Sequence, residues 1–154
     1  MRGPLPLTVL ARDDWRISTS CPPTIGVEEE YFLVDPHTRM PQPAGARVAR
    51  RAGTTLGDLV CGEFTQYQIE VKTPPCAGAA QLREQLLRLR GATAAAAAAE
   101  GLRICATGTP VLSACAPAPI GEHPRYRAGV AQYRGMLQDF VICALHVHVR
   151  LPDA

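Results

Sequence analysis

The stretch TIGVEEEYFLVD at residues 24–35 constrains the fold more than any other part of this chain. Val27 and Leu33 fall on one parity, whereas Glu28 and Glu30 fall on the other. Such alternation is typical of a β-strand with one face on a core and a polar opposite face. The DPHT sequence that follows is a turn signal. We therefore predict a strand here whose polar face presents two carboxylates.

The rest of the chain alternates between extended and helical patterns. Ile69 and Val71 alternate with polar residues, which predicts a second strand over residues 66–73. Leucines at helical spacing, followed by Gly101, predict the clearest helix over residues 79–100. We further expect a loop-like region at 39–62, a short strand at 102–108, a weaker helix around 126–137 and a buried last strand at 140–150. This order predicts an α+β domain whose antiparallel or mixed sheet is covered by helices on one side.

The bulk composition suits one domain of 154 residues, preceded by an irregular, Pro-rich leader at residues 1–23. A net charge of +2 gives no reason to expect nucleic acid as a partner. No stretch reaches the roughly 20 apolar residues of a membrane span, so no membrane partner is expected. The six cysteines include no CxxC pair, which favours free thiols in a reducing cytosol. We expect a soluble, cytoplasmic protein, and the sequence leaves a homo-oligomer open.

Four glutamates are candidates for a metal site. Glu28 and Glu30 lie two apart on a strand, so their carboxylates point the same way with Cα atoms about 6.5–7 Å apart. From spacing alone, the first explanation of this pair is a solvated strand face, and metal binding is the alternative because like charges on a sheet are costly without a cation. Glu63 precedes Glu70 by seven residues, which on one regular strand would put them on opposite faces. A bulge or a loop at Glu63 would be needed to bring both to one site.

His146 and His148 alternate with valines near the end of the chain. A single strand histidine is more often a satisfied core residue than a ligand, but two on one face make ligation an equal alternative. Carboxylates with at most one imidazole suit Mg²⁺ or Mn²⁺ better than zinc. A zinc hydrolase would need Cys143 or a third histidine beside the pair. Neither a GxxxxGK[ST] phosphate loop nor a GxGxxG turn occurs, so a bound nucleotide would be held through metal ions and arginines.

Three stretches together carry a resemblance to a known family. TIGVEEEYFLVD, EFTQYQIEVKTP and RYR…CALHVHV, with LPD after it, resemble the carboxylate–amine ligases of the glutamate–cysteine ligase type 2 family. The resemblance implies that residues 24–154 are the N-terminal part of a ligase catalytic domain. It also implies an incomplete glutamine-synthetase-like catalytic fold, a curved and mainly antiparallel sheet with helices on one face. ATP would lie over the concave face of that sheet.

The resemblance also implies roles for individual residues. Mg²⁺ or Mn²⁺ would be held by five side chains, which are Glu28, Glu30, Glu63, Glu70 and His146. His148 would contact phosphate or substrate. The implied reaction is ATP-dependent amide formation between glutamate and cysteine, or another amine. An acyl phosphate would form on the γ-carboxylate, and γ-glutamylcysteine, a compound of glutathione-type thiol biosynthesis, would be the product.

Two departures from the family keep an alternative open. Family members usually have glycine after HVHV, where this chain has Arg150, and they are more than twice this length. The alternative is a truncated, non-catalytic remnant, a fragment that binds metal, nucleotide or a partner chain. Release of ADP that requires both glutamate and cysteine would separate the two interpretations.

Overall fold

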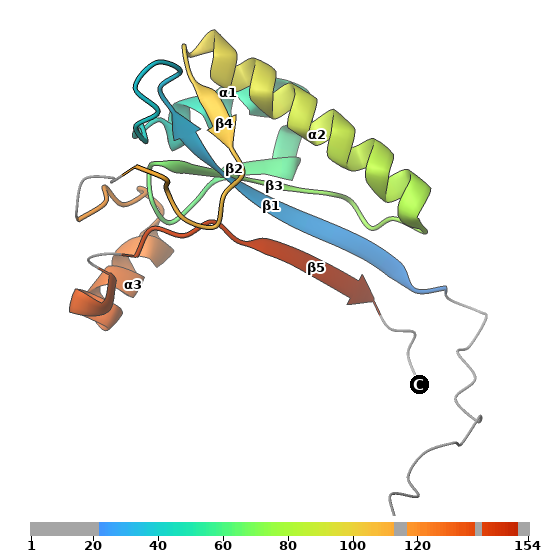
Figure 1. The fold of residues 1–154 in the computed structure, drawn as a ribbon. Helices are drawn as coiled ribbons and strands as arrows, with labels where there is room; N and C mark the ends of the chain where they lie inside the picture. Colours follow the sequence, from blue (N-terminus) through green and yellow to red (C-terminus); the bar gives the residue numbers. More distant parts are fainter. Residues whose placement is uncertain (1–21, 113–116, 138–139, 151–154) are drawn as a thin grey trace, which may run out of the picture.

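The computed structural model describes residues 22–112, 117–137 and 140–150, so that the predicted leader lies almost entirely outside the described residues. Within these ranges, five strands form one antiparallel sheet in the order β2-β3-β1-β4, and β5 also pairs with β1 (Figure 1). The strands are β1 (Thr24–Val34), β2 (Val60–Gly62), β3 (Gln68–Lys72), β4 (Arg103–Cys105) and β5 (Leu145–Arg150). The predicted antiparallel sheet is confirmed.

The long strand β1 lies at the centre of this sheet. Along one edge it pairs with β3, from Glu28 opposite Lys72 to Phe32 opposite Gln68. Along its other edge it pairs with two strands in succession, β5 at its N-terminal half and β4 at its C-terminal end. Every other strand except β2 is therefore registered directly against β1.

Two helices, α1 (Gly45–Leu56) and α2 (Ala79–Ala99), cover one face of the sheet (Figure 1). Between the helices and the sheet lies the main core, which includes Tyr31, Leu33, Val48, Leu56, Ile69, Val71 and Leu89. The third helix, α3 (Pro124–Tyr133), lies on the other side of the sheet and is followed by the 3-10 turn η2 (Arg134–Leu137). No helix in the described ranges is long and apolar enough to cross a membrane.

The prediction of a loop-like region at residues 39–62 is wrong, because this region contains α1, the 3-10 turn η1 (Gly57–Leu59) and β2. Val48, Ala52 and Leu56 recur every four residues and are buried, so α1 is an amphipathic helix with a narrow, small-residue apolar face. Its first residue must be small. A Cβ at Gly45 would lie 2.5 Å from the carbonyl oxygen of Gln68.

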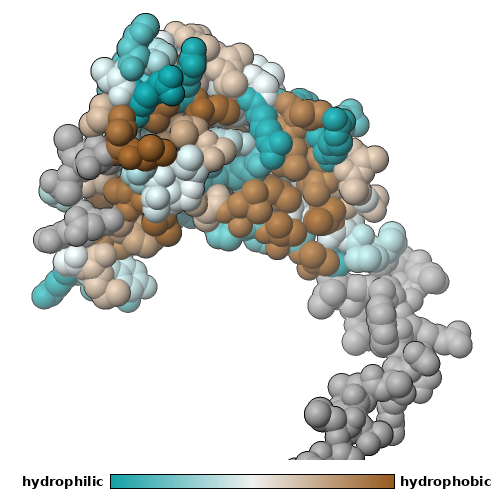
Figure 2. All heavy atoms as spheres, viewed as in Figure 1, coloured by the Kyte–Doolittle hydropathy of each residue, from teal (hydrophilic) through white to brown (hydrophobic). Residues whose placement is uncertain are grey.

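The prediction that the last strand is buried is also wrong. All six residues of β5 are exposed, and the side chains of Leu145, Val147 and Val149 are each more than half exposed. β5 pairs only with β1 among the described strands, and α2 does not extend over it (Figure 1). Figure 2 shows the resulting hydrophobic surface over β5. The hydrophobic composition of this segment therefore predicts the strand correctly but does not predict its exposure.

A partly buried ion pair joins α2 to β1. The guanidinium of Arg90 donates two hydrogen bonds to the carboxylate of Glu29, whose side chain is only 7% exposed, and the hydroxyl of Tyr31 donates a third at 2.5 Å. Burial alone would raise the pKa of Glu29, but the hydrogen bonds and charge of Arg90 and the Tyr31 hydroxyl lower it overall. The Glu29 carboxylate is thus compensated in the folded chain.

We expect substitutions of Arg90 and of Glu29 to lower the free energy of unfolding by unequal amounts. Arg90→Met leaves a buried carboxylate without its cation and should lower the free energy of unfolding by about 3 kcal/mol at neutral pH. Glu29→Gln leaves Arg90 free to reach water, since half of its side chain is exposed, and should cost roughly 1 kcal/mol. Urea unfolding of both variants measures the difference.

The pH dependence of this difference follows from the direction of the pKa shift. In the wild type, the stability that Glu29 contributes is lost as the pH falls through its lowered pKa. In Arg90→Met, the remaining buried carboxyl is relieved by protonation, so the gap between variant and wild type should narrow in acid. A gap that stays constant from neutral pH to about pH 4 would contradict the pair's electrostatic role.

Candidate metal centre

Three glutamates from three different segments meet on the face of the sheet opposite α1 and α2. Glu30 of β1 is the direct cross-strand partner of Glu70 on β3. Cys61 of β2 is the partner of Glu70 on the other side, so Glu63, two residues after Cys61, shares the same face. The chain reverses between Glu63 and Glu70. The seven-residue interval therefore spans a hairpin connection, which resolves the parity conflict in favour of the loop alternative.

We call Glu30, Glu63 and Glu70 the glutamate trio. One carboxylate oxygen from each lies within 4.8 Å of the others, and all three residues are partly buried. Burial raises the pKa of Glu30, and the charges of Glu63 and Glu70 raise it further. Burial likewise raises the pKa of Glu63, together with the charges of Glu70 and Glu28. The three carboxylates are therefore close enough to share one divalent cation, and such a cation would offset their mutual repulsion.

A small polar network fixes the carboxylate of Glu30. Its Oε2 accepts hydrogen bonds from the Gln68 side-chain amide at 3.2 Å and from the Ala144 backbone N–H at 2.9 Å. Gln68 also donates to the Ile142 carbonyl, and its own side-chain oxygen accepts from the hydroxyl of Thr65. The network joins β1, β3 and the segment entering β5. Sequence reasoning missed Gln68, although it shares the parity of Glu70 on β3.

Glu28 and the two histidines form a separate group beside the trio. Glu28 lies directly opposite His146, and its Oε2 lies 3.3 Å from Nδ1 of His146 and 3.2 Å from Nε2 of His148. The two imidazole rings are 6.3 Å apart between centroids. The structure thus gathers the predicted residues into two sets. Glu28, His146 and His148 form one set, and the trio forms the other.

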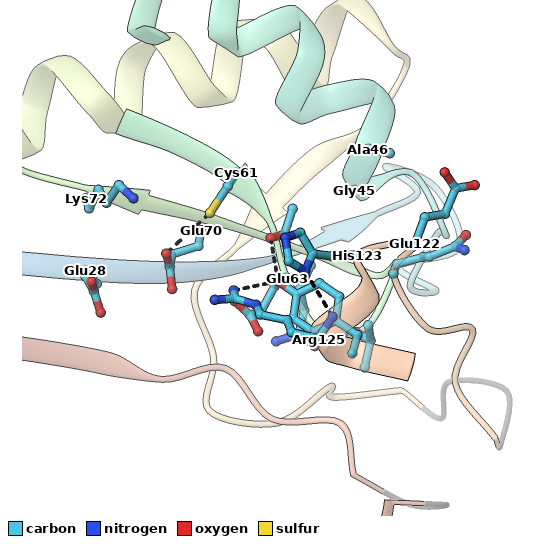
Figure 3. A pocket seen from close by; sticks show the side chains of 16 residues that line it. Glu28, Gly45, Ala46, Cys61, Glu63, Glu70, Lys72, Glu122, His123 and Arg125 are labelled. Atoms are coloured by element: carbon cyan, nitrogen blue, oxygen red, sulfur yellow. Dashed lines mark hydrogen bonds between the residues drawn. The ribbon is translucent and has the colours of Figure 1, made fainter. Parts of the chain in front are cut away.

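A large cavity of about 690 Å³ opens beside the trio, and Glu63 and Glu70 line it (Figure 3). Arg125 and Tyr126 at the start of α3 also line it. The Tyr126 hydroxyl donates to the Gly62 carbonyl at 3.1 Å and accepts from Arg125 at 2.9 Å. Gly121 permits the close approach of this segment, because a Cβ there would lie 2.8 Å from the Glu63 carbonyl oxygen. The lining of this cavity therefore combines carboxylates with the guanidinium of Arg125, whose charge acts to lower the pKa of Glu63.

Comparison with known proteins identifies the family of this chain. The model of glutamate–cysteine ligase family 2 matches residues 24–154. The chain belongs to this family. It is 40% identical over 130 residues to the protein named "Putative glutamate–cysteine ligase 2-1" of Saccharopolyspora erythraea, covering 84% of this chain. A second relative, "Putative glutamate–cysteine ligase 2-2" of Mycolicibacterium vanbaalenii, is 40% identical over 131 residues, covering 85% of this chain.

The glutamate–cysteine ligase family 2 relatives are longer than this chain, which spans about a third of their length, 34% and 35% respectively. Solved structures share the fold. A glutamate–cysteine ligase from Francisella tularensis in complex with AMP superimposes with a TM-score of 0.61 at 18% identity, over 84% of this chain and 27% of that protein. A bifunctional glutathione synthetase from Pasteurella multocida gives 0.58 at 17% identity, over 84% and 17%.

In this member of glutamate–cysteine ligase family 2, two cysteines lie near the site without joining the glutamate trio. The Cys61 thiol donates to Glu70 at 3.4 Å, and burial together with the Glu70 charge raises its pKa to about 11. Burial also raises the pKa of Cys143 to about 12, and its sulfur faces Gln68. Neither sulfur belongs to the set of side chains spaced to share one ion, which consists of carboxylates alone. Within the described ranges, the trio is the one set of three side chains spaced to ligate a common ion.

The raised pKa values of Glu30 and Glu63 predict a specific pH dependence without divalent cations. The folded chain keeps protons on these carboxyls that the unfolded chain releases, so stability should fall as the pH rises from the ordinary carboxyl range through the raised values. Glu63→Gln should flatten this fall. Urea unfolding in EDTA from about pH 5 to about pH 8 measures it.

The matched control for this measurement is Glu84→Gln on α2, because Glu84 is exposed and far from the trio. It should leave the slope of stability against pH unchanged. An equal slope of stability against pH in wild type and Glu63→Gln would contradict the mutual repulsion of the carboxylates in the trio.

Proposed function

We propose that this chain carries the metal-binding and nucleotide-binding face of an ATP-dependent carboxylate–amine ligase that joins glutamate to cysteine or to another amine. The observation that carries the proposal is the glutamate trio, held on one face of the antiparallel sheet beside the large cavity, in a chain of glutamate–cysteine ligase family 2. The trio supports a charged, phosphate-bearing substrate, because like charges so placed favour a bridging cation.

The residues of the trio fit Mg²⁺ or Mn²⁺. Three carboxylate oxygens within 4.8 Å of one another supply the oxygen ligands that such hard ions prefer. Glu30, Glu63 and Glu70 would hold one ion. Glu28 and His146, which contact each other one row along the sheet, would contribute ligands to a second. A bound ion would neutralise charge on the transferring phosphoryl group.

The large cavity supports the assignment of ATP as cosubstrate. Its volume of about 690 Å³ lies within the usual range for pockets that bind ligands of nucleotide size. Arg125 on its wall could pair with a phosphate, because a guanidinium matches phosphate oxygens in a bidentate arrangement. The Francisella structure that shares this fold was solved with AMP, which favours an adenine nucleotide. His148, beside Glu28, would contact phosphate or substrate.

The proposed chemistry needs two displacements. An oxygen of the glutamate γ-carboxylate attacks the terminal phosphorus of ATP, and ADP leaves, giving an acyl phosphate. The amine of the second substrate then attacks the acyl carbon, loses a proton and expels inorganic phosphate. The chain's own contribution is orientation. Gln68 and the Ala144 N–H fix Glu30, and Tyr126 fixes Arg125, so the charged groups need little rearrangement during the reaction.

Two further expectations remain part of this proposal. Cys61, Cys76, Cys105 and Cys143 are free thiols, which supports a reducing, cytoplasmic setting. The match to the first of the relatives that carry the ligase name covers 34% of that relative's length. Binding without catalysis is therefore the second candidate function. It shares the metal and nucleotide sites with the first and differs from it only in turnover.

The test compares the wild type with Glu70→Gln and with the exposed control Glu84→Gln. Glu70→Gln should weaken Mg²⁺ binding by at least about tenfold, a loss of 1.4 kcal/mol, because it removes one charge from the trio. The control should bind Mg²⁺ as the wild type does. Glu29→Gln is unsuitable as a control because Glu29 belongs to the buried pair with Arg90. Calorimetric titration of Mg²⁺, and then of Mg²⁺ with ATP, measures both steps.

Turnover is then measured as ADP release with Mg²⁺, ATP, glutamate and cysteine. Release that requires both amino acids and disappears in Glu70→Gln supports the ligase. Metal and nucleotide binding without any ADP release supports the binding-only candidate. Equal Mg²⁺ affinity in all three proteins would refute the metal site itself.

A further inference from the structure

Gln68 on β3 is a buried polar residue whose side-chain amide contacts two different elements. The residue is only 2% exposed. Its Nε2 donates to Oε2 of Glu30 at 3.2 Å and to the Ile142 carbonyl at 2.5 Å, and it lies 3.5 Å from the sulfur of Cys143. Glu30 belongs to the trio, whereas Ile142 and Cys143 belong to residues 142–144, which we call the entry segment because β5 follows it. One nitrogen atom therefore joins a proposed metal ligand to the segment that leads into β5.

The surroundings of Gln68 fix the orientation of its amide. The hydroxyl of the buried Thr65 donates to Gln68 Oε1 at 2.5 Å. The Ile142 carbonyl and the Glu30 carboxylate are acceptors, so the amide nitrogen must face them. A glutamate at position 68 would turn an acceptor toward these two acceptors, and a lysine there would repel a cation at the trio. A neutral amide supplies the donor without either penalty.

Glu30 also binds the entry segment directly. Its Oε2 accepts from the Ala144 N–H at 2.9 Å, and its own N–H donates to the Ala144 carbonyl at 3.2 Å. A further backbone hydrogen bond runs from the Cys143 N–H to the Gly108 carbonyl at 2.9 Å. Side-chain burial adds little support to β5 itself, since all six of its residues are exposed. Besides its backbone ladder with β1, the position of β5 therefore depends on Glu30 and Gln68.

The two oxygens of the Glu30 carboxylate have different surroundings. Oε2 accepts the hydrogen bonds from Gln68 and from Ala144, whereas Oε1 accepts none from the described residues. On the opposite face of β1, both carboxylate oxygens of Glu29 accept from Arg90. An ionised carboxylate has about four lone-pair sites, so Oε1 can bind an ion while Oε2 keeps its donors. Glu30 can therefore contact a cation and the entry segment at the same time.

This double contact links ion binding to the order of β5. A carboxylate fixed by an ion has already lost its rotamer freedom, so accepting hydrogen bonds from Gln68 and Ala144 costs it less conformational entropy. The entry segment should then bind β1 more tightly. Such linkage is reciprocal, because the ordered entry segment raises the affinity of the trio for the ion by the same factor.

We propose that Gln68 is a positioning residue that couples cation binding at the trio to the pairing of residues 142–150 with β1. This inference rests on the proposed function, because it requires the cation site. It adds cooperativity to that function. An occupied trio orders β5, and the ordered strand places His146 and His148 against Glu28. Gln68 itself acts through Glu30 and Ile142, without contact to the ion.

The experiment measures hydrogen exchange of the backbone amides of residues 142–150 in the whole chain, in EDTA and at saturating Mg²⁺. Local opening that leaves the ion equally well bound is unaffected by Mg²⁺. In the wild type, Mg²⁺ should slow this exchange about fivefold or more, and in Gln68→Met by less than about twofold. Gln68→Met keeps the side-chain length and removes the donors. Its Mg²⁺ affinity, measured by calorimetry, should fall about tenfold, as for other residues that orient a metal ligand.

Gln66→Met is the matched control, because Gln66 donates its side-chain amide to the Ile120 carbonyl at 2.9 Å. It should keep the Mg²⁺ affinity and the Mg²⁺-dependent slowing of the wild type. Thr65→Val retains Gln68 but removes the hydroxyl that orients it, so the slowing should decrease in this variant as well. Urea unfolding in EDTA checks that every variant folds. A residue that only stabilised the fold would lower the free energy of unfolding and leave the Mg²⁺-dependent slowing unchanged.

Two results would overturn the coupling and leave the metal site standing. One is exchange of residues 142–150 that Mg²⁺ does not slow in the wild type, although Mg²⁺ binds and Glu70→Gln weakens its binding. The other is equal slowing in wild type, Thr65→Val and Gln68→Met, which would make Gln68 a purely structural residue. Failure of the proposed function looks different. Mg²⁺ would then bind equally to wild type and Glu70→Gln, and that result would overturn the coupling as well.

Discussion

The pairing of β1 with three other strands is the constraint on which the candidate site depends. Because β1 is hydrogen-bonded to β3 on one edge and to β5 and β4 on the other, side chains from residues 24–150 are ordered in rows across it. One row holds Glu70 and Glu30, and the next holds Lys72, Glu28 and His146. A shift of one residue in either register would turn these side chains to the helix-covered face.

The carboxylates on the two faces of β1 have opposite pKa shifts. On the helix side, Glu29 has a guanidinium and a hydroxyl as partners, and its pKa is lowered. On the other side, Glu30 has an amide and a backbone N–H, two neighbouring carboxylates, and a raised pKa. The first arrangement stabilises the fold by itself. The second is stable only to the extent that protons or a cation reduce its repulsion, which is the property expected of a site built for metal.

Period-two alternation was sufficient to predict β1 and β3, and helical spacing was sufficient for α2, because these elements bury a whole face. It could not show that β5 is exposed, since burial depends on what packs over a strand. It also missed α1, whose apolar face is made of small residues. Strand parity alone could not join Glu63 to Glu70; the family resemblance joined them, and the hairpin connection explains how they meet. The contacts of Gln68 and Arg125 depend on cross-strand and helix packing, which alternation of residues does not show.

β5, whose side chains are all exposed, carries His146 and His148 of the candidate site. β5 pairs only with β1 among the described strands, and its apolar side chains lie exposed, so little burial opposes its local opening. Yet it supplies His146 and His148, and the segment that enters it donates to Glu30 through the Ala144 N–H. Any ligand that bridges β1 and β5 therefore binds the paired form and stabilises it by mass action. Ligand affinity at the candidate site and the order of β5 are consequently coupled, and a substitution that weakens the pairing of β5 would weaken binding without contacting the ligand.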